Sequence, residues 1–236
     1  HSLMQHIGIG EPWDLNRTQP NGVQLWQPYQ KRKNQDWYRG TADALYQNRN
    51  LIREDGSDTI LILSGDHIYK QDYRELISFH KEKGADLTVA VMTVDPADVS
   101  RFGIMSIDDN QKIVRFVEKP RHSESRLASM GIYVFNAPFL LQLLEEDGAD
   151  PDSAHDFGKS IIPKIVEMGR AYAYPFAGYW VDVGTIQAYW ETNMALLDEK
   201  PGLDLYDPNW VLHTRSKERP PVKCIPPGQM INSLAS

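Results

Sequence analysis

The sequence predicts an α/β fold in which helices cover a mixed and mostly parallel sheet, and three observations lead to this prediction. Apolar runs of strand length alternate along the chain with segments of helical periodicity. Gly84 and Gly169 each follow a segment of the helical kind, at a position where glycine commonly ends a helix. Hydrophobic residues make up 41% of the 236 residues, which is enough for a globular core.

The first half of the chain is expected to hold a loop, two helices and two strands. Its first 37 residues show little periodicity and contain turn-forming proline and glycine, so we expect a loop there. Helical spacing and β-branched alternation predict the other elements, which are a helix over about 42–53 with Thr41 as its N-cap, a strand over 59–63, a helix over 71–83 and a strand over 87–94.

The second half continues the alternation. Asp108, Asp109 and Asn110 favour a turn, so the runs on either side of them predict a hairpin. The expected elements are strands over 103–107, 112–117, 131–135 and 171–176, and helices over about 138–146, 160–168 and 186–197. Paired prolines beyond Pro201 are typical of a linker, so we expect a partial domain over 1–200 and a linker over 201–236.

Composition weighs against several classes of protein. The net charge of −7 argues against a nucleic-acid partner, which would need clustered lysine and arginine. No apolar run approaches the roughly 18–20 residues of a membrane span. Cys224 is the only cysteine, so an intrachain disulfide cannot form, and a reducing cytoplasmic location fits the sequence.

Two aspartates follow apolar runs in positions that suit a ligand. Asp66 comes just after the strand over 59–63, and such a carboxylate must be solvated, paired or bound to a cation. Asp182 lies beside aromatic residues ahead of a helix, and the two carboxylates could share one cation, as metal-assisted phosphoryl chemistry requires. The alternative interpretation is structural: Asp66 caps the following helix, and Asp182 or Thr185 caps the next one.

Two further stretches combine groups that bind sugars and anions. Glu118 and Lys119 end a strand and could offer a carboxylate to hydroxyl groups and an ammonium to a phosphate, or form only a surface ion pair. Gly40 and Thr41 open a helix whose N-terminus favours anions, or they form an ordinary helix start. The adjacent His155 and Asp156 do not by themselves predict a catalytic triad.

Taken in order, several strings resemble the ADP-glucose pyrophosphorylase branch of the sugar-nucleotide pyrophosphorylase family. The resemblance covers nearly the whole chain and rests on WYRGTADA (37–44), GDHIYKQDY (65–73), FVEKP (116–120), SMGIYVF (129–135), HDFG (155–158) and WVDVGTIQAYW (180–190). It implies a Rossmann-like nucleotidyltransferase domain followed by a left-handed β-helix. It also implies that ATP and α-D-glucose 1-phosphate react to ADP-glucose and pyrophosphate for glycogen or starch synthesis.

The resemblance also implies roles for individual residues. Asp66 and Lys119 would be the catalytic residues, and Asp66 and Asp182 would hold Mg²⁺. Glu118 and Lys119 would bind the glucose hydroxyls and the sugar phosphate. The remaining substrate-binding positions would be Tyr38, Gly103, Ser129, Asp156 and Trp180. The intact protein would be a homo-oligomer, a tetramer in this family.

One feature departs from the family pattern. The glycine-rich loop that cradles the ATP phosphates in the family has no match in residues 1–37. We therefore expect an internal fragment, truncated at the N-terminal strands and before the β-helix, that is inactive or nearly so alone. Three alternatives stay open at this point: a pyrophosphorylase for UTP or dTTP, a non-catalytic regulatory homologue that binds sugar phosphate, and an ordinary α/β domain whose motifs are only caps and turns.

Overall fold

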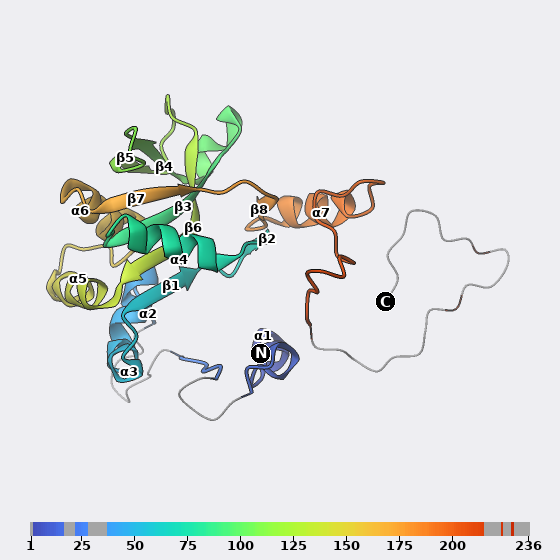
Figure 1. Cartoon of the computed structure of the whole chain (residues 1–236), viewed down its shortest axis with the longest axis horizontal. Coiled ribbons are helices and arrows are strands. Elements are labelled where there is room, and N and C mark those ends of the chain that lie inside the picture. The colour runs from blue at the N-terminus through green and yellow to red at the C-terminus, as the bar shows by residue number, and fades with distance from the viewer. Residues whose placement is uncertain (1, 17–21, 28–36, 215–222, 224–227, 229–236) are drawn as a thin grey trace. The chain divides into compact units, whose positions relative to one another are not determined.

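The computed structural model of the protein describes residues 2–16, 22–27, 37–214, 223 and 228. The chain forms two compact units. The larger unit comprises Gln27–Gly65 and Gln71–Gly178, and the smaller unit comprises His1–Trp26, Asp66–Lys70 and Tyr179–Ser236. Figure 1 shows the elements of both units along the chain.

A six-stranded mixed sheet organises the larger unit. Its strands are β1 (Thr59–Leu63), β3 (Leu87–Thr93), β4 (Gly103–Ile107), β5 (Ile113–Glu118), β6 (Leu127–Asn136) and β7 (Ala171–Pro175). The order is β5-β4-β6-β3-β7, and β1 also pairs with β6. The predicted α/β class and mixed sheet are confirmed.

The predicted direction of most strands needs a correction. Among the described strands of this sheet, β3 and β7 form the single parallel pair, and the other pairings are antiparallel. Strand β6 lies between β1 and β3 and runs against both of them. Hydrophobic periodicity locates strands but carries no information about their direction. The sequence pattern therefore could not predict that an antiparallel strand, β6, separates β1 from β3.

Strand β6 is continuous but irregular at its middle. Its first residues pair with β4, and its last five pair with β1, so one edge of β6 serves two neighbours. On the other edge the register with β3 shifts between Val89 and Val91. Gly131 lies in the corresponding part of β6 with φ of 66°, a left-handed conformation that glycine adopts without a steric penalty. Such bulges re-aim neighbouring side chains.

Helices pack on both faces of the larger sheet. Helix α4 (Tyr73–Glu82) contacts β3, β6 and β7, in front of which it lies in Figure 1. The other helices are α2 (Thr41–Gln47), α3 (Arg49–Asp55), α5 (Ala137–Ala149) and α6 (Ile162–Glu167), with a π-helical turn at Phe157–Ile161 and a 3-10 turn at Pro96–Arg101. Helices α2, α5 and α6 contribute to a core cluster that includes Leu87, Val89 and Val91 of β3.

The smaller unit contains elements that periodicity missed. Strands β2 (His67–Tyr69) and β8 (Trp180–Asp182) form an antiparallel pair. Three residues are too few to show alternation, so neither strand could be recognised from the pattern. The unit also holds α7 (Ile186–Ala195), α1 (Ser2–Ile7) and a 3-10 turn at Glu11–Trp13, and the last two correct the prediction that the first 37 residues are a loop.

Most other predicted elements are confirmed with shifted ends. The helix expected over 42–53 is two helices that meet at Asn48, and the helix expected over 160–168 begins as the π-helical turn. The division into 1–200 and 201–236 stays a prediction, and the proline pairs at 220–221 and 226–227 lie outside the described residues. Within the described ranges, no helix is both long enough and apolar enough to span a membrane.

Candidate functional site

The smaller unit brings Asp66 and Asp182 together. Asp66 immediately precedes β2, and Asp182 ends β8 directly opposite His67 in the antiparallel register. Residues opposite each other in such a pair project to the same face, so His67 joins the two carboxylates. One ligand atom from each of the three residues lies within 4.8 Å of the others, and His67 Nε2 is 3.6 Å from Asp66 Oδ1.

Backbone contacts fix this arrangement. The N–H of Val183 donates to the Asp66 carbonyl oxygen at 3.0 Å, and the N–H of Gly184 donates to Asp182 Oδ1 at 2.7 Å. A Cβ at Gly184 would lie only 2.9 Å from that carboxylate oxygen, so glycine permits the tight bend. The Trp180 ring packs edge-on against His67 with 5.2 Å between the ring centroids.

The interpretation of Asp66 and Asp182 as helix caps is wrong, whereas the alternative that Thr185 caps the second helix is confirmed. Asp72 caps α4 by accepting a hydrogen bond from the N–H of Arg74, and Thr185 caps α7 by accepting one from the N–H of Ala188. The carboxylates of Asp66 and Asp182 thus stay beside each other on the β2–β8 pair. Carboxylate oxygens are the donors that hard divalent cations prefer, and an imidazole alongside them is also a metal ligand, so the donor set fits a divalent cation.

The larger unit brings together Gly103 and Glu118. They are paired directly in the β4–β5 register. A Cβ at Gly103 would lie 2.9 Å from Glu118 Oε2, and a Cβ at Gly158 would lie 2.5 Å from the same atom. Glu118 is therefore packed against two glycine backbones. Burial raises the pKa of the Glu118 carboxyl. The positive charges of Lys119 and Lys159 partly offset this rise, and the negative charge of Asp156 adds to it.

Lys119 follows Glu118 in an unusual backbone conformation. Its φ is 46°, in the left-handed region that non-glycine residues rarely adopt. Its N–H donates to the Phe102 carbonyl oxygen at 3.1 Å, which holds the end of β5 against the start of β4. In the described part of the chain, Lys119 forms no ion pair with Glu118, so the alternative of a simple surface pair is not supported.

Ser129 lies next to the bulge of β6. Its Oγ accepts a hydrogen bond from the N–H of Gly131 at 3.2 Å and is 3.4 Å from the Tyr133 hydroxyl oxygen. Burial raises the pKa of Tyr133 to about 12, so this hydroxyl stays protonated at neutral pH. The Tyr133 ring stacks on Phe157 with 5.8 Å between the centroids.

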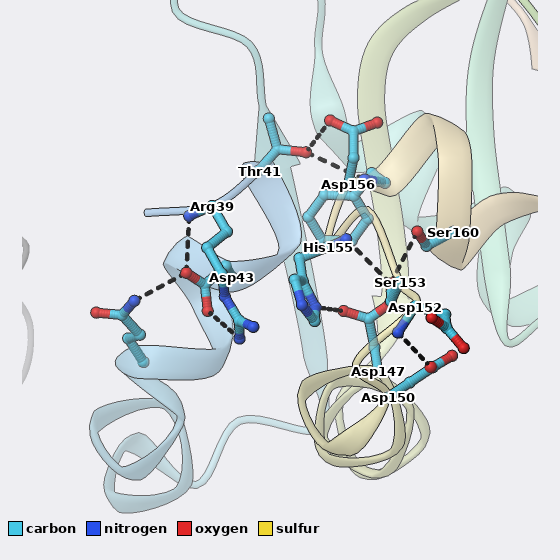
Figure 2. A network of polar contacts seen from close by, with 12 residues as sticks. Arg39, Thr41, Asp43, Asp147, Asp150, Asp152, Ser153, His155, Asp156 and Ser160 are labelled. Atoms are coloured by element: carbon cyan, nitrogen blue, oxygen red, sulfur yellow. Dashed lines mark hydrogen bonds and ion pairs between the residues drawn. The ribbon is translucent and has the colours of Figure 1, made fainter. Parts of the chain in front are cut away.

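Asp156 joins two segments that are distant in the sequence (Figure 2). Its Oδ1 accepts hydrogen bonds from the N–H groups of Gly158 and Lys159 at 3.0 and 3.1 Å, and its Oδ2 accepts one from the Thr41 hydroxyl at 3.0 Å. Thr41 Oγ1 in turn accepts the N–H of Phe157 at 3.1 Å. The prediction that Thr41 caps α2 is therefore wrong: Gly40 occupies the cap position, and the threonine hydroxyl bridges to Asp156.

The predicted residues thus fall into two groups. In the larger unit Glu118 packs against Gly103 and Gly158, Gly158 bonds Asp156, and Ser129 lies beside Tyr133, whose ring stacks on Phe157. In the smaller unit Asp66 and Asp182 lie together, and Trp180 packs against His67, which lies beside both. The Tyr38 hydroxyl accepts a hydrogen bond from Asn48 at 3.0 Å, and among the described contacts it makes none to Glu118, Ser129 or Asp156.

Sequence reasoning missed four residues that complete these groups, namely His67, Tyr133, Phe157 and Gly158. Their signal was present, because all four lie inside strings quoted for the family resemblance. What the strings could not show is which neighbours of a binding residue contact it.

Comparisons with known proteins match nearly the whole chain. A family model described as nucleotidyl transferase matches residues 1–199. The glucose-1-phosphate adenylyltransferase of Thermomicrobium roseum is 50% identical over 236 residues, which are 100% of this chain and 55% of that protein. The enzyme of that name from Fervidobacterium nodosum is 51% identical over 100% of this chain and 57% of its own length. The one from Clostridium acetobutylicum is 51% identical over 93% of this chain and 58% of its own length. The chain thus spans little more than half the length of these relatives.

Proposed function

Because the chain belongs to the nucleotidyl transferase family, we propose that its protein transfers the adenylyl group of ATP to α-D-glucose 1-phosphate, which yields ADP-glucose and pyrophosphate for glycogen or starch synthesis. Relatives about half identical over the whole chain, all named glucose-1-phosphate adenylyltransferase, support this choice of substrates. The observation that carries it in the structure is the packing of Glu118 against Gly103 and Gly158, the latter of which donates its N–H to Asp156.

The proposed reaction needs no protein nucleophile. An oxygen of the sugar phosphate attacks the α-phosphorus of ATP, the bond from that phosphorus to the bridging oxygen breaks, and pyrophosphate leaves with the electron pair. The chain's contribution is to position the reactants and neutralise charge. In this proposal Glu118 accepts hydrogen bonds from glucose hydroxyls, the Lys119 ammonium pairs with the sugar phosphate, and the missing side chain of Gly103 lets the Glu118 carboxylate pack against the β4 backbone.

Asp66 and Asp182 would hold a divalent cation, which fits their geometry and the nearby imidazole of His67. Such a cation supplies charge neutralisation at the phosphates when it is bound. The proposal includes Mg²⁺ as this cation, Tyr38 and Trp180 as further substrate contacts, a homotetramer as the assembly of the intact protein, and the cytoplasm as its location.

Binding is the direct test, because the glycine-rich loop expected for ATP is not among these 236 residues. Calorimetric titration of the chain with glucose 1-phosphate and Mg²⁺ should show binding that Lys119→Ala weakens at least about 10-fold, because it removes a charge-assisted contact. Lys81→Ala is the matched control, since Lys81 is an exposed lysine of α4 in the same unit. If the folded wild-type chain does not bind, or both variants bind like wild type, the assignment of this half-site is wrong.

A further inference from the structure

Asp147, in the last turn of α5, and His155, in the loop between α5 and the π-helical turn, form a buried acid–histidine pair for which the proposed reaction has no use. We propose that Asp147 and His155 are positioning residues: they fix the bend that holds Asp156 and Thr41 in place for the sugar phosphate. The inference rests on the proposed function for its consequence, but its structural part can be tested without any ligand.

The pair is buried, and both carboxylate oxygens of Asp147 have a described partner (Figure 2). The exposed fraction is 3% for His155 and 9% for Asp147, and His155 Nδ1 lies 2.9 Å from Asp147 Oδ2. The other carboxylate oxygen, Oδ1, accepts a hydrogen bond from the Ser153 hydroxyl at 2.5 Å. Breaking a buried pair of this kind leaves an unpaired polar group, which is strongly unfavourable.

The serine in this network does not make it a hydrolytic triad. Ser153 Oγ is bonded to the Asp147 carboxylate and lies 3.0 Å from Ser160 Oγ, and it accepts the backbone N–H of His155 at 3.0 Å. A triad needs the imidazole between the serine and the acid, so that the ring can take the serine proton. Here the acid lies between the two other side chains, which is an arrangement for holding the loop.

The pair holds the backbone of His155 in a strained conformation. The φ of His155 is 51°, and this left-handed bend directs its carbonyl oxygen at the first turn of α2. That oxygen accepts the N–H of Ala42 at 2.9 Å and the N–H of Asp43 at 3.2 Å. A Cβ at Gly40 would collide with the same oxygen, so glycine is needed for the close approach. Strain of this kind persists only where the surroundings enforce it.

Short contacts connect the bend at His155 to Glu118, the proposed sugar-binding carboxylate. Once the His155 carbonyl fixes the start of α2, Thr41 lies where its hydroxyl can bridge Asp156 and Phe157. Asp156 then orders the turn that presses Gly158 against Glu118. Loss of the Asp147–His155 pair should therefore loosen both Asp156 and the packing of Glu118, although among the described contacts no side-chain hydrogen bond or ion pair joins the pair to Asp156 or Glu118.

Three variants separate positioning from mere stability. His155→Leu removes the ring nitrogen, whereas His155→Asn keeps a donor near the Nδ1 position and is one of the residues that tolerates positive φ. His80→Leu is the matched control, because His80 is also buried and its Nδ1 lies 2.9 Å from Thr88 Oγ1 in the α4–β3 contact. Both leucine variants should lower the unfolding free energy.

Two measurements decide the question in the intact chain. Amide hydrogen exchange at Ala42 and Asp43 should become faster in His155→Leu, stay near wild type in His155→Asn, and be unaffected by His80→Leu at conditions where all variants are folded. Glucose 1-phosphate affinity should fall about 10-fold or more in His155→Leu alone, because small displacements of positioning groups have large effects. Asp147→Asn should change both readouts in the same direction and serves if His155→Leu does not fold.

The outcomes distinguish this inference from the function on which it rests. Unchanged exchange at Ala42 and Asp43 in folded His155→Leu would overturn the positioning role, as would a loss of affinity in His80→Leu equal to that in His155→Leu. Failure of the folded wild-type chain to bind glucose 1-phosphate would contradict the proposed function instead, while the exchange data would still decide whether the pair fixes the bend.

Discussion

The Glu118 carboxyl should make the stability of the protein depend on pH, and the direction of the change can be stated. Because burial raises the pKa of Glu118 above its ordinary 4.5, the folded chain binds this proton more tightly than the unfolded chain does. Stability should therefore fall as pH rises from the unfolded pKa through the folded one, and the penalty persists above it. Glu118→Gln imitates the neutral form and removes this fall.

Urea unfolding across the acid-to-neutral range measures the difference. The unfolding free energy of wild type relative to Glu118→Gln should decrease as pH rises through that window. If wild type instead gains stability over the variant with rising pH, Glu118 is stabilised as the carboxylate, and the assigned burial effect is wrong.

Residue types at strand ends allowed a partial prediction of the site. Asp66, Asp182 and Glu118 follow apolar runs, where a carboxylate must be solvated, paired or bound to a ligand. All three lie in groups that suit a ligand. Thr41 shows the limit of such reasoning, because its place before a helix suggested a cap. Its actual partner, Asp156, is 115 residues away, and no local pattern reports a contact at that separation.

Among the strands, the bulge of β6 is where local conformation most affects the site. Gly131→Ala should lower the unfolding free energy by about 1–2 kcal/mol, because a side chain at positive φ approaches the backbone too closely. Gly56→Ala is the matched control: Gly56 also has positive φ, at 70°, so it should lose stability for the same reason, but it ends α3 and is not part of β6. Chemical denaturation of both variants gives the comparison.

Only Gly131→Ala should also weaken glucose 1-phosphate binding. The N–H of Gly131 donates to Ser129 Oγ, and the carbonyl oxygen of Gly131 accepts the N–H of Ser64. Equal affinity in the two folded variants would mean that the bulge does not position Ser129. The sequence located β6 but not its bulge, since a glycine within a strand pattern has several structural meanings.

At the scale of a whole unit, a bound cation should increase the stability of the smaller unit against unfolding. A divalent cation that binds the folded smaller unit should slow hydrogen exchange at Ile68 and Val181. At a free cation concentration of 100 times the dissociation constant, the slowing should correspond to an increase of up to about 2.7 kcal/mol in the free energy of opening. Chelation should reverse the effect. Asp66→Asn and Asp182→Asn should abolish it, and Asp198→Asn, at an exposed aspartate of the same unit, should not. Protection that survives in both site variants would place the cation elsewhere.

The order of segments within the two units has a consequence for how this protein can change by rearrangement of its gene. The chain passes from one unit to the other after Trp26, Gly65, Lys70 and Gly178. The five residues Asp66–Lys70, which include a carboxylate of the proposed cation site, are enclosed in the sequence by segments of the larger unit. A single crossover therefore cannot exchange either unit intact, and an exchange that replaces one unit also divides the other.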